Sequence, residues 1–145
     1  MLGVWESHST LPLLEKIAAF GEKRQQVLAG NLANIDTPSY RTRDLPVKKF
    51  QEALRAQIAG RNQVNPTSPS ERGDTAAPVM TQPISQKLYE AVEVSSGSQS
   101  FQDGSNRSIE RELTEMTKNS MLQQFSIELM TAQTNLLQAV ISERP

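Results

Sequence analysis

The sequence predicts a mainly α protein with long N- and C-terminal amphipathic helices that pack as a coiled-coil-like pair or bundle around a partly irregular middle segment. Apolar residues recur at helical spacing near both ends of the 145-residue chain, and most of its eight prolines lie between these two patterns. The apolar fraction of 37% and the aromatic fraction of 5% are low for a compact globule. We therefore expect apolar burial that is local or shared with partners.

The first helix is expected from about Leu11 to Asn34. Its apolar stripe consists of Leu14, Ile17, Phe20, Val27 or Leu28, and Leu32. Thr10 is a suitable N-cap, and Pro12 falls in the first turn, where its missing N–H costs nothing. Gly21 and Gly30 each lower helix propensity by up to about 1 kcal/mol. Two interpretations of these glycines remain open: close helix–helix approach, or a helix that is weak in isolation.

The second helix is expected from an N-cap at Ser108 almost to Arg144, because no glycine or proline interrupts this stretch. Its early glutamates, Glu110, Glu112 and Glu115, suit the positive end of the helix dipole. A 4-3 heptad seam runs through Ile109, Leu113, Met116, Ile127, Met130, Leu137 and Ile141, with polar residues at 120, 123 and 134.

A neighbouring apolar stripe widens the apolar arc of this second helix. It consists of Leu122, Phe125, Leu129, Ala132, Leu136 and Val140. Such a helix is expected to need more than one neighbour. An antiparallel pair that closes on itself is an alternative, but the broad arc and the few apolar residues between the helices favour packing between subunits.

The chain thus divides into residues 1–40, 41–107 and 108–145, of which the middle part is variable and rich in linkers. The stretches 65–78 and 95–106 are rich in proline, serine and glycine and are predicted to be irregular. A short helix is expected at 47–59, where Phe50, Leu54 and Ile58 follow helical spacing, whereas 84–94 fits a helix or a strand. Residues 41–61 are locally basic, which favours a solvated surface or a subunit contact over a phosphate site.

Composition argues against an enzyme, a cofactor or metal site, and a nucleic-acid partner. The formal charge is −1 with a pI near 5.9, so no overall basic field attracts a polyanion. Cysteine is absent, His8 is the only histidine, and no carboxylate pair or glycine-rich phosphate loop is present. The first residues do not resemble an ordinary cleaved signal peptide. No 18-residue apolar run occurs, so direct insertion into a membrane is not expected.

The first helix is followed by the string NLANIDTPSY at 31–40, which predicts an abrupt helix end. Asn34 can take a left-handed position at the helix C-terminus, Asp36 can form an Asx turn, and Pro38 forces Thr37 out of the helical region. Tyr40 offers a large amphipathic ring that can fold back on the helix or dock on a neighbour.

This string resembles the N-terminal signature of the bacterial flagellar rod and hook proteins, in which N-x-A-N leads into T-P-G-Y. The following RTRD and the C-terminal stretch SIERELTEMTKNSMLQQFSIELMTAQTNLLQAVI are also similar to short rod subunits of this family. The resemblance covers about the first 50 and the last 38 residues. Ser39 replaces the usual glycine, so a type I turn is expected rather than a type II turn with positive φ. Phe125 stands near a common tyrosine.

The resemblance implies a structural subunit of the proximal rod of the flagellar basal body, made in the cytoplasm and located in the periplasmic part of the rod. It implies export by the flagellar type III apparatus, polymerisation through the terminal helices and a requirement for motility. The implied partners are further copies of the chain, rod proteins of the FlgC, FlgF and FlgG types, and a FliE-type adaptor. A sister rod protein such as FlgC and a soluble helical adaptor or chaperone are the alternatives.

The residues expected to carry assembly lie on the two terminal helices and in the turn after the first. They are Leu14, Ile17, Leu28, Asn31, Leu32, Asn34, Thr37, Pro38, Tyr40, Leu113, Met116, Asn119, Phe125, Leu129 and Leu136.

Overall fold

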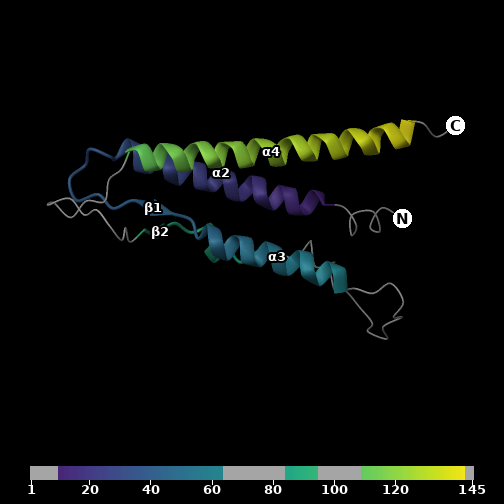
Figure 1. Cartoon of the computed structure of the whole chain (residues 1–145), viewed down its shortest axis with the longest axis horizontal. Helices are drawn as coiled ribbons and strands as arrows, with labels where there is room; N and C mark the ends of the chain where they lie inside the picture. Colours follow the sequence, from purple (N-terminus) through teal and green to yellow (C-terminus); the bar gives the residue numbers. More distant parts are fainter. Residues whose placement is uncertain (1–9, 64–83, 95–108, 143–145) are drawn as a thin grey trace.

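The computed structural model describes residues 10–63, 84–94 and 109–142 (Figure 1). Its elements are α2 (Leu11–Ala33), β1 (Arg43–Asp44), α3 (Val47–Gln63), the 3-10 helix η2 (Gln86–Tyr89), β2 (Val92–Glu93) and α4 (Ile109–Ser142). The prediction of a mainly α fold with long terminal helices is confirmed. Within these ranges, no helix is both long and apolar enough to cross a lipid bilayer. Ser108, His8 and the linkers 65–78 and 95–106 lie outside the described residues.

Helix α2 lies between α4 on one side and α3 on the other (Figure 1). It runs antiparallel to α4, because Thr10 at its start contacts Gln133 whereas Asn31 near its end contacts Glu112. Helix α4 has 34 residues and α2 has 23. The C-terminal part of α4 therefore extends beyond the start of α2, as Figure 1 shows.

The apolar core lies on the α3 side of α2. Its buried members are Phe20, Leu45, Phe50 and Ile84. The rings of Phe20 and Phe50 stack with centroids 3.9 Å apart, and Tyr89 meets both rings edge-on at 6.0 and 6.3 Å. Because aromatic pairs add to area burial, this cluster joins α3 and η2 to α2.

The middle segment contains the expected short helix and a mixture of conformations at 84–94. Helix α3 begins at Val47 as predicted and ends four residues later than expected, at Gln63. Residues 84–94 form η2 and then β2, so both open alternatives occur there. Strand β2 pairs antiparallel with β1, and the Val94 N–H extends the pairing by donating to the Thr42 carbonyl at 3.0 Å.

The turn after α2 differs from two expectations. Asn34 has φ −104° and ψ 14°, so it is not left-handed, and its side-chain amide donates to the Gly30 carbonyl at 2.8 Å. Ser39 has φ 60°, and the Tyr40 N–H donates to the Thr37 carbonyl at 3.3 Å. This is the positive φ at the third turn position that type II turns require, so the prediction of a type I turn is wrong.

Hydrogen bonds to α2 explain why the turn adopts this conformation with serine. The Tyr40 hydroxyl donates to Asn31 Oδ1 at 3.2 Å, and the Arg43 N–H donates to the same oxygen at 3.0 Å. The chain must therefore reverse sharply within a few residues and return along the helix. These contacts offset the backbone strain at Ser39.

Ser39→Gly is expected to stabilise the chain by up to about 1 kcal/mol. A left-handed conformation costs a residue with a Cβ about 1–2 kcal/mol, whereas the extra backbone freedom of glycine costs about 0.5–1 kcal/mol. Urea unfolding of both proteins measures the difference. Ser39→Val serves as the opposite control and should be less stable than the original chain. A glycine variant of lower stability would contradict the assigned turn.

Candidate assembly surface

Helix α4 contacts α2 through a row of mainly polar side chains, which we call the polar seam. On α4 these residues are Glu112, Glu115, Asn119, Gln123, Ser126 and Gln133. Asn119 is 2% exposed and Ser126 is 1% exposed, so the centre of the seam is fully excluded from solvent. Buried polar groups are tolerated when they are hydrogen-bonded, and Asn119 and Ser126 both make such bonds, whereas the buried Oε1 of Gln133 has no hydrogen-bonding partner among the described residues.

Asn31 joins the helix pair to the turn. Its side-chain amide donates to the Arg43 carbonyl at 2.7 Å and to Glu112 Oε2 at 3.0 Å. Its Oδ1 accepts from the Tyr40 hydroxyl and the Arg43 N–H, as described above. An asparagine side chain has two donor hydrogens and two acceptor lone pairs, and all four are used at a residue that is only 1% exposed.

Arg24 forms the charged part of the seam. Its guanidinium makes a two-bond contact with Asp44, at 2.8 and 2.7 Å, and a third bond to Glu115 Oε2 at 2.8 Å. The hydrogen bond to Asp44, and then that to Glu115, raise the pKa of Arg24 despite its burial. The single guanidinium of Arg24 on α2 therefore binds both α4 and the strand β1.

Gly21 brings the two helices close together. A Cβ added there would lie 3.3 Å from Gln123 Cβ, and the Asn119 amide donates to the Gly21 carbonyl at 2.8 Å and to Gln25 Oε1 at 2.9 Å. The close-approach interpretation is therefore confirmed for Gly21. It does not hold for Gly30, where an added Cβ would meet nothing within 4 Å.

Thr10 begins α2 as predicted, but not through a side-chain cap. Its carbonyl accepts hydrogen bonds from the N–H groups of Leu13 and Leu14 at 3.1 Å, and these are the first backbone hydrogen bonds of the helix. No capping hydrogen bond comes from its hydroxyl. The hydroxyl oxygen instead accepts from Gln133 Nε2, so this residue belongs to the polar seam.

The observed seam corrects the predicted heptad register of α4. The predicted and the observed registers share Met116, Gln123 and Met130. Between these shared positions the observed seam contains Asn119, Ser126 and Gln133, whereas the predicted seam contains positions 120, 127 and 134. The prediction followed the apolar residues. The polar side chains bind α2 instead, because each finds a hydrogen-bonding partner on that helix or in its own backbone.

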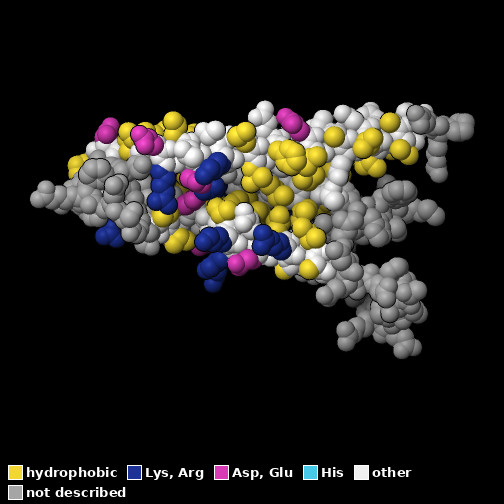
Figure 2. Space-filling view, in the orientation of Figure 1, with side chains coloured by type: hydrophobic (Ala, Val, Ile, Leu, Met, Phe, Trp, Pro, Cys, Tyr) yellow, Lys and Arg dark blue, Asp and Glu magenta, His cyan; other side chains and the backbone are white. Residues whose placement is uncertain are grey.

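Two groups of apolar side chains on α4 are consequently exposed beside the seam. The first apolar stripe is Ile109, Leu113 and Ile127, and the second apolar stripe is Leu122, Phe125, Leu129, Leu136 and Val140. Figure 2 shows hydrophobic side chains along α4 to its C-terminal end and a larger group across α2, between α4 and α3. Full burial of such a side chain is worth about 1.5–3 kcal/mol. A surface of this kind marks an interaction site.

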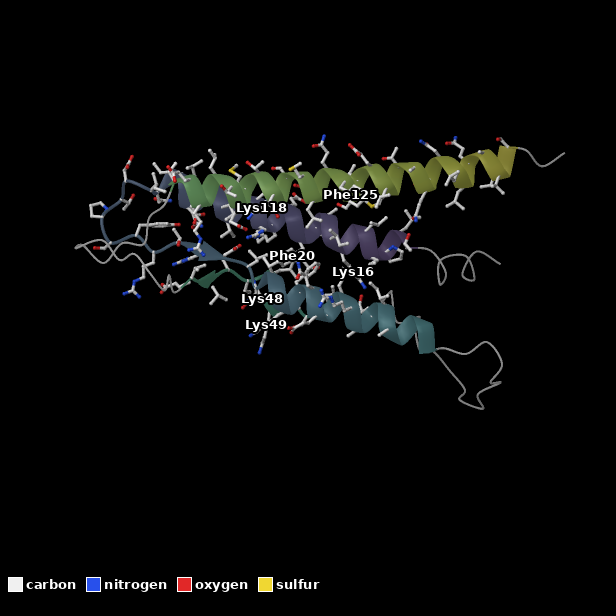
Figure 3. All side chains as sticks on the ribbon, viewed as in Figure 1. Lys16, Phe20, Lys48, Lys49, Lys118 and Phe125 are labelled. Atoms are coloured by element: carbon white, nitrogen blue, oxygen red, sulfur yellow. The ribbon has the colours of Figure 1, made fainter. Side chains whose placement is uncertain are left out.

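The predicted assembly residues fall into three environments. Leu14, Leu28, Asn31 and Asn119 are buried, while Ile17, Leu32, Asn34, Tyr40 and Met116 are partly buried. Thr37, Pro38, Leu113, Phe125, Leu129 and Leu136 are exposed. Phe125 projects from α4, whereas Phe20 faces α3 from α2 (Figure 3). The predicted set therefore mixes residues that hold the helix pair together with residues available to a neighbour.

Sequence reasoning did not select Arg24, Gln25, Glu115 or Gln133 as binding residues. A signal for Arg24 exists in the 3-4 spacing of α2, which runs through Leu14, Ile17, Gly21, Arg24, Leu28 and Asn31. A charged residue and an amide in a heptad seam indicate polar partners on the facing helix. The early glutamates of α4 suit the helix dipole, and Glu112 and Glu115 also supply these partners.

Acid is expected to weaken the contact between α2 and α4. The hydrogen bond from Arg24, and then that from Lys118, lower the pKa of Glu115 from its ordinary value of 4.5. A lowered pKa in the folded state means that the contribution of Glu115 is complete above pH 4.5 and is lost as the pH falls through the folded value. Urea unfolding of the original chain and of Glu115→Gln at several pH values measures this. A stability difference that is independent of pH would contradict the assignment.

Comparison with known proteins decides the family. No model of a protein family matches the chain. The flagellar basal body rod protein FlgB of Aquifex aeolicus is 33% identical over 132 residues, which cover 91% of this chain and 92% of that protein. The chain belongs to the FlgB family.

Two further FlgB proteins agree with this assignment. FlgB of Bacillus subtilis is 28% identical over 136 residues, covering 92% of this chain and 93% of that protein. FlgB of Escherichia coli is 27% identical over 111 residues, covering 77% of each. The matches to the Aquifex and Bacillus proteins extend over the middle segment, where the signature string gave no resemblance. A FlgB protein has a structural role in the rod of the flagellar basal body, which fits a protein that is not an enzyme.

Proposed function

We propose that the chain is a structural subunit of the proximal flagellar rod that polymerises through its two terminal helices. The observation that carries this proposal is the pair of apolar stripes on α4, which stay exposed although α4 is already paired with α2. Hydrophobic burial favours covering such surfaces by a neighbouring subunit. The helix pair forms the inner layer of the shaft, and residues 41–107 form the outer part.

The partners in this assembly are further copies of the chain and other rod components. We expect these components to be rod proteins of the FlgC, FlgF and FlgG types and a FliE-type adaptor, as the resemblance to flagellar rod proteins implies. The chain reaches them in the periplasmic space through the flagellar type III export apparatus, after synthesis in the cytoplasm. Motility depends on it because the rod transmits rotation.

A soluble helical adaptor or chaperone is the second candidate. It would also contain a helix pair, but a finished adaptor of fixed size has no need of exposed apolar residues along most of a 34-residue helix. The two candidates differ in outcome when the gene is removed, because a rod subunit is required to build the basal body, whereas an adaptor that does not serve the flagellum is not.

Deletion of the gene in its host, with motility scored and basal bodies imaged by electron cryotomography, tests the proposal. Loss of the rod and of swimming, restored by a plasmid copy, is the expected result. Normal rods and swimming in a strain shown to carry no second copy would overturn the proposal and favour the adaptor.

A further inference from the structure

We infer that the polar seam fixes the register and rotation of α4 against α2, with Asn31 and Asn119 as its positioning residues. Successive residues lie about 100° apart around a helix, so the two apolar stripes sit roughly 60–120° to either side of Asn119. Apolar burial by itself would turn α4 until one stripe faced α2. The structure has the opposite arrangement, with both stripes exposed and Asn119 buried.

Asn31 sets the position of α4 at one end of the pair. Its four hydrogen bonds reach α4 through Glu112, the turn through Tyr40, and β1 through both backbone groups of Arg43. A slip of one residue moves Glu112 by about 1.5 Å along the helix and about 100° around it. Any other register therefore leaves a buried amide without one of its partners, which is unfavourable.

Asn119 sets the position at a second level, ten residues earlier on α2. Its amide binds the Gly21 carbonyl and Gln25, and the close approach that this requires exists only where α2 has a glycine. Two such points, one on each helix, define both the axial position and the rotation of α4. Buried asparagines specify register in coiled coils in the same way.

This inference concerns the helix pair itself, so its test does not depend on the assembly role. The chain has no cysteine, which permits nitroxide labels at Ala19→Cys and Thr114→Cys, two exposed positions on α2 and α4. Double electron–electron resonance on the full chain measures the distance between them. We expect one narrow distance for the labelled chain, and a broadened or second distance after Asn31→Leu and Asn119→Leu are added. A slip of three or four residues displaces the second distance by about 5 Å.

Leu28→Ala is the matched control, because Leu28 is buried on the same face of α2 without a side-chain hydrogen-bonding group. It should lower the melting temperature but keep the single distance. Three results would overturn the inference: an unchanged narrow distance in the asparagine variant, equal broadening in Leu28→Ala, or a broad distance before any seam residue is changed. If the variant with both asparagines replaced loses its helical circular dichroism signal, the distance between the labels is measured in the Asn119→Leu variant alone. The same three results would then overturn the inference.

Discussion

Leu129→Asp is expected to abolish incorporation of the chain into the rod while leaving the α2–α4 pair folded. Leu129 belongs to the second apolar stripe and is 38% exposed, so an aspartate there remains hydrated in the single chain. In an assembled rod the same carboxylate would be buried against a neighbour. An unpaired charge in such an interface opposes burial by several kcal/mol at least. Complementation of the deletion strain, scored by swimming and by tomography of basal bodies, measures the effect.

Asn135→Asp is the control for this substitution. Asn135 lies on the same helix and is exposed, but it belongs to neither apolar stripe. It receives the same charge, so it separates the effect of the charge from the loss of an apolar side chain in the stripe. We expect this variant to swim. Normal rods from Leu129→Asp, with circular dichroism confirming that both proteins are helical, would show that the second stripe is not an assembly contact.

Gly21→Leu is expected to separate α2 from α4 and destabilise the chain by about 2–4 kcal/mol. The added Cβ would lie 3.3 Å from Gln123 Cβ, and the larger side chain has no space beside Asn119. Overpacking costs about 1–3 kcal/mol, and loss of the bond from Asn119 to the Gly21 carbonyl leaves buried polar groups unpaired. Urea unfolding followed by circular dichroism measures this loss.

Gly30→Ala provides the opposite result on the same helix. Nothing lies within 4 Å of a Cβ at this position, so alanine should stabilise α2 by up to about 1 kcal/mol through its helix propensity. A Gly21→Leu protein as stable as the original would mean that the helices do not approach closely there. Destabilisation by Gly30→Ala would point to a contact beyond those of the single chain.

The helices were predictable because helical periodicity is a local property of the sequence. The bounds of α2 and α4 agree with the predicted ranges to within about two residues, and the start of α3 is correct. The partner of each face was not predictable from the same pattern. Apolar stripes mark surfaces that become buried, but the pattern is the same whether the covering helix belongs to the same chain or to a neighbour.

The polar seam explains the principal error. The predicted heptad seam follows the apolar residues of α4, whereas Asn119 and Ser126 are buried against α2 and Ile127 is exposed. A polar residue can be recognised as a seam residue only when its partner is known. One of the two partners of Asn119 is the backbone carbonyl of Gly21, which has no side chain to indicate it, and the other is the side chain of Gln25.

The turn and the segment 84–94 depended on tertiary contacts in a similar way. Serine disfavours positive φ, so local propensity predicted the wrong turn at Ser39, and the hydrogen bonds of Asn31 to the returning chain prevailed. Residues 84–94 combine a 3-10 turn and a two-residue strand. Their conformation is set by packing of Tyr89 on Phe20 and Phe50 and by pairing with β1, neither of which is local.

We expect the apolar stripes of α4, and not its polar seam, to contact neighbouring subunits in the rod. Photocrosslinking in living cells tests it directly, with p-benzoylphenylalanine placed at Phe125 in the second stripe or at Asn135 outside both stripes. Phe125 is 58% exposed and already aromatic, so the probe replaces it with little disturbance. We predict adducts to another rod subunit from Phe125 in assembled basal bodies and none from Asn135. Adducts from Asn135 alone, or none from Phe125 in motile cells, would contradict the account.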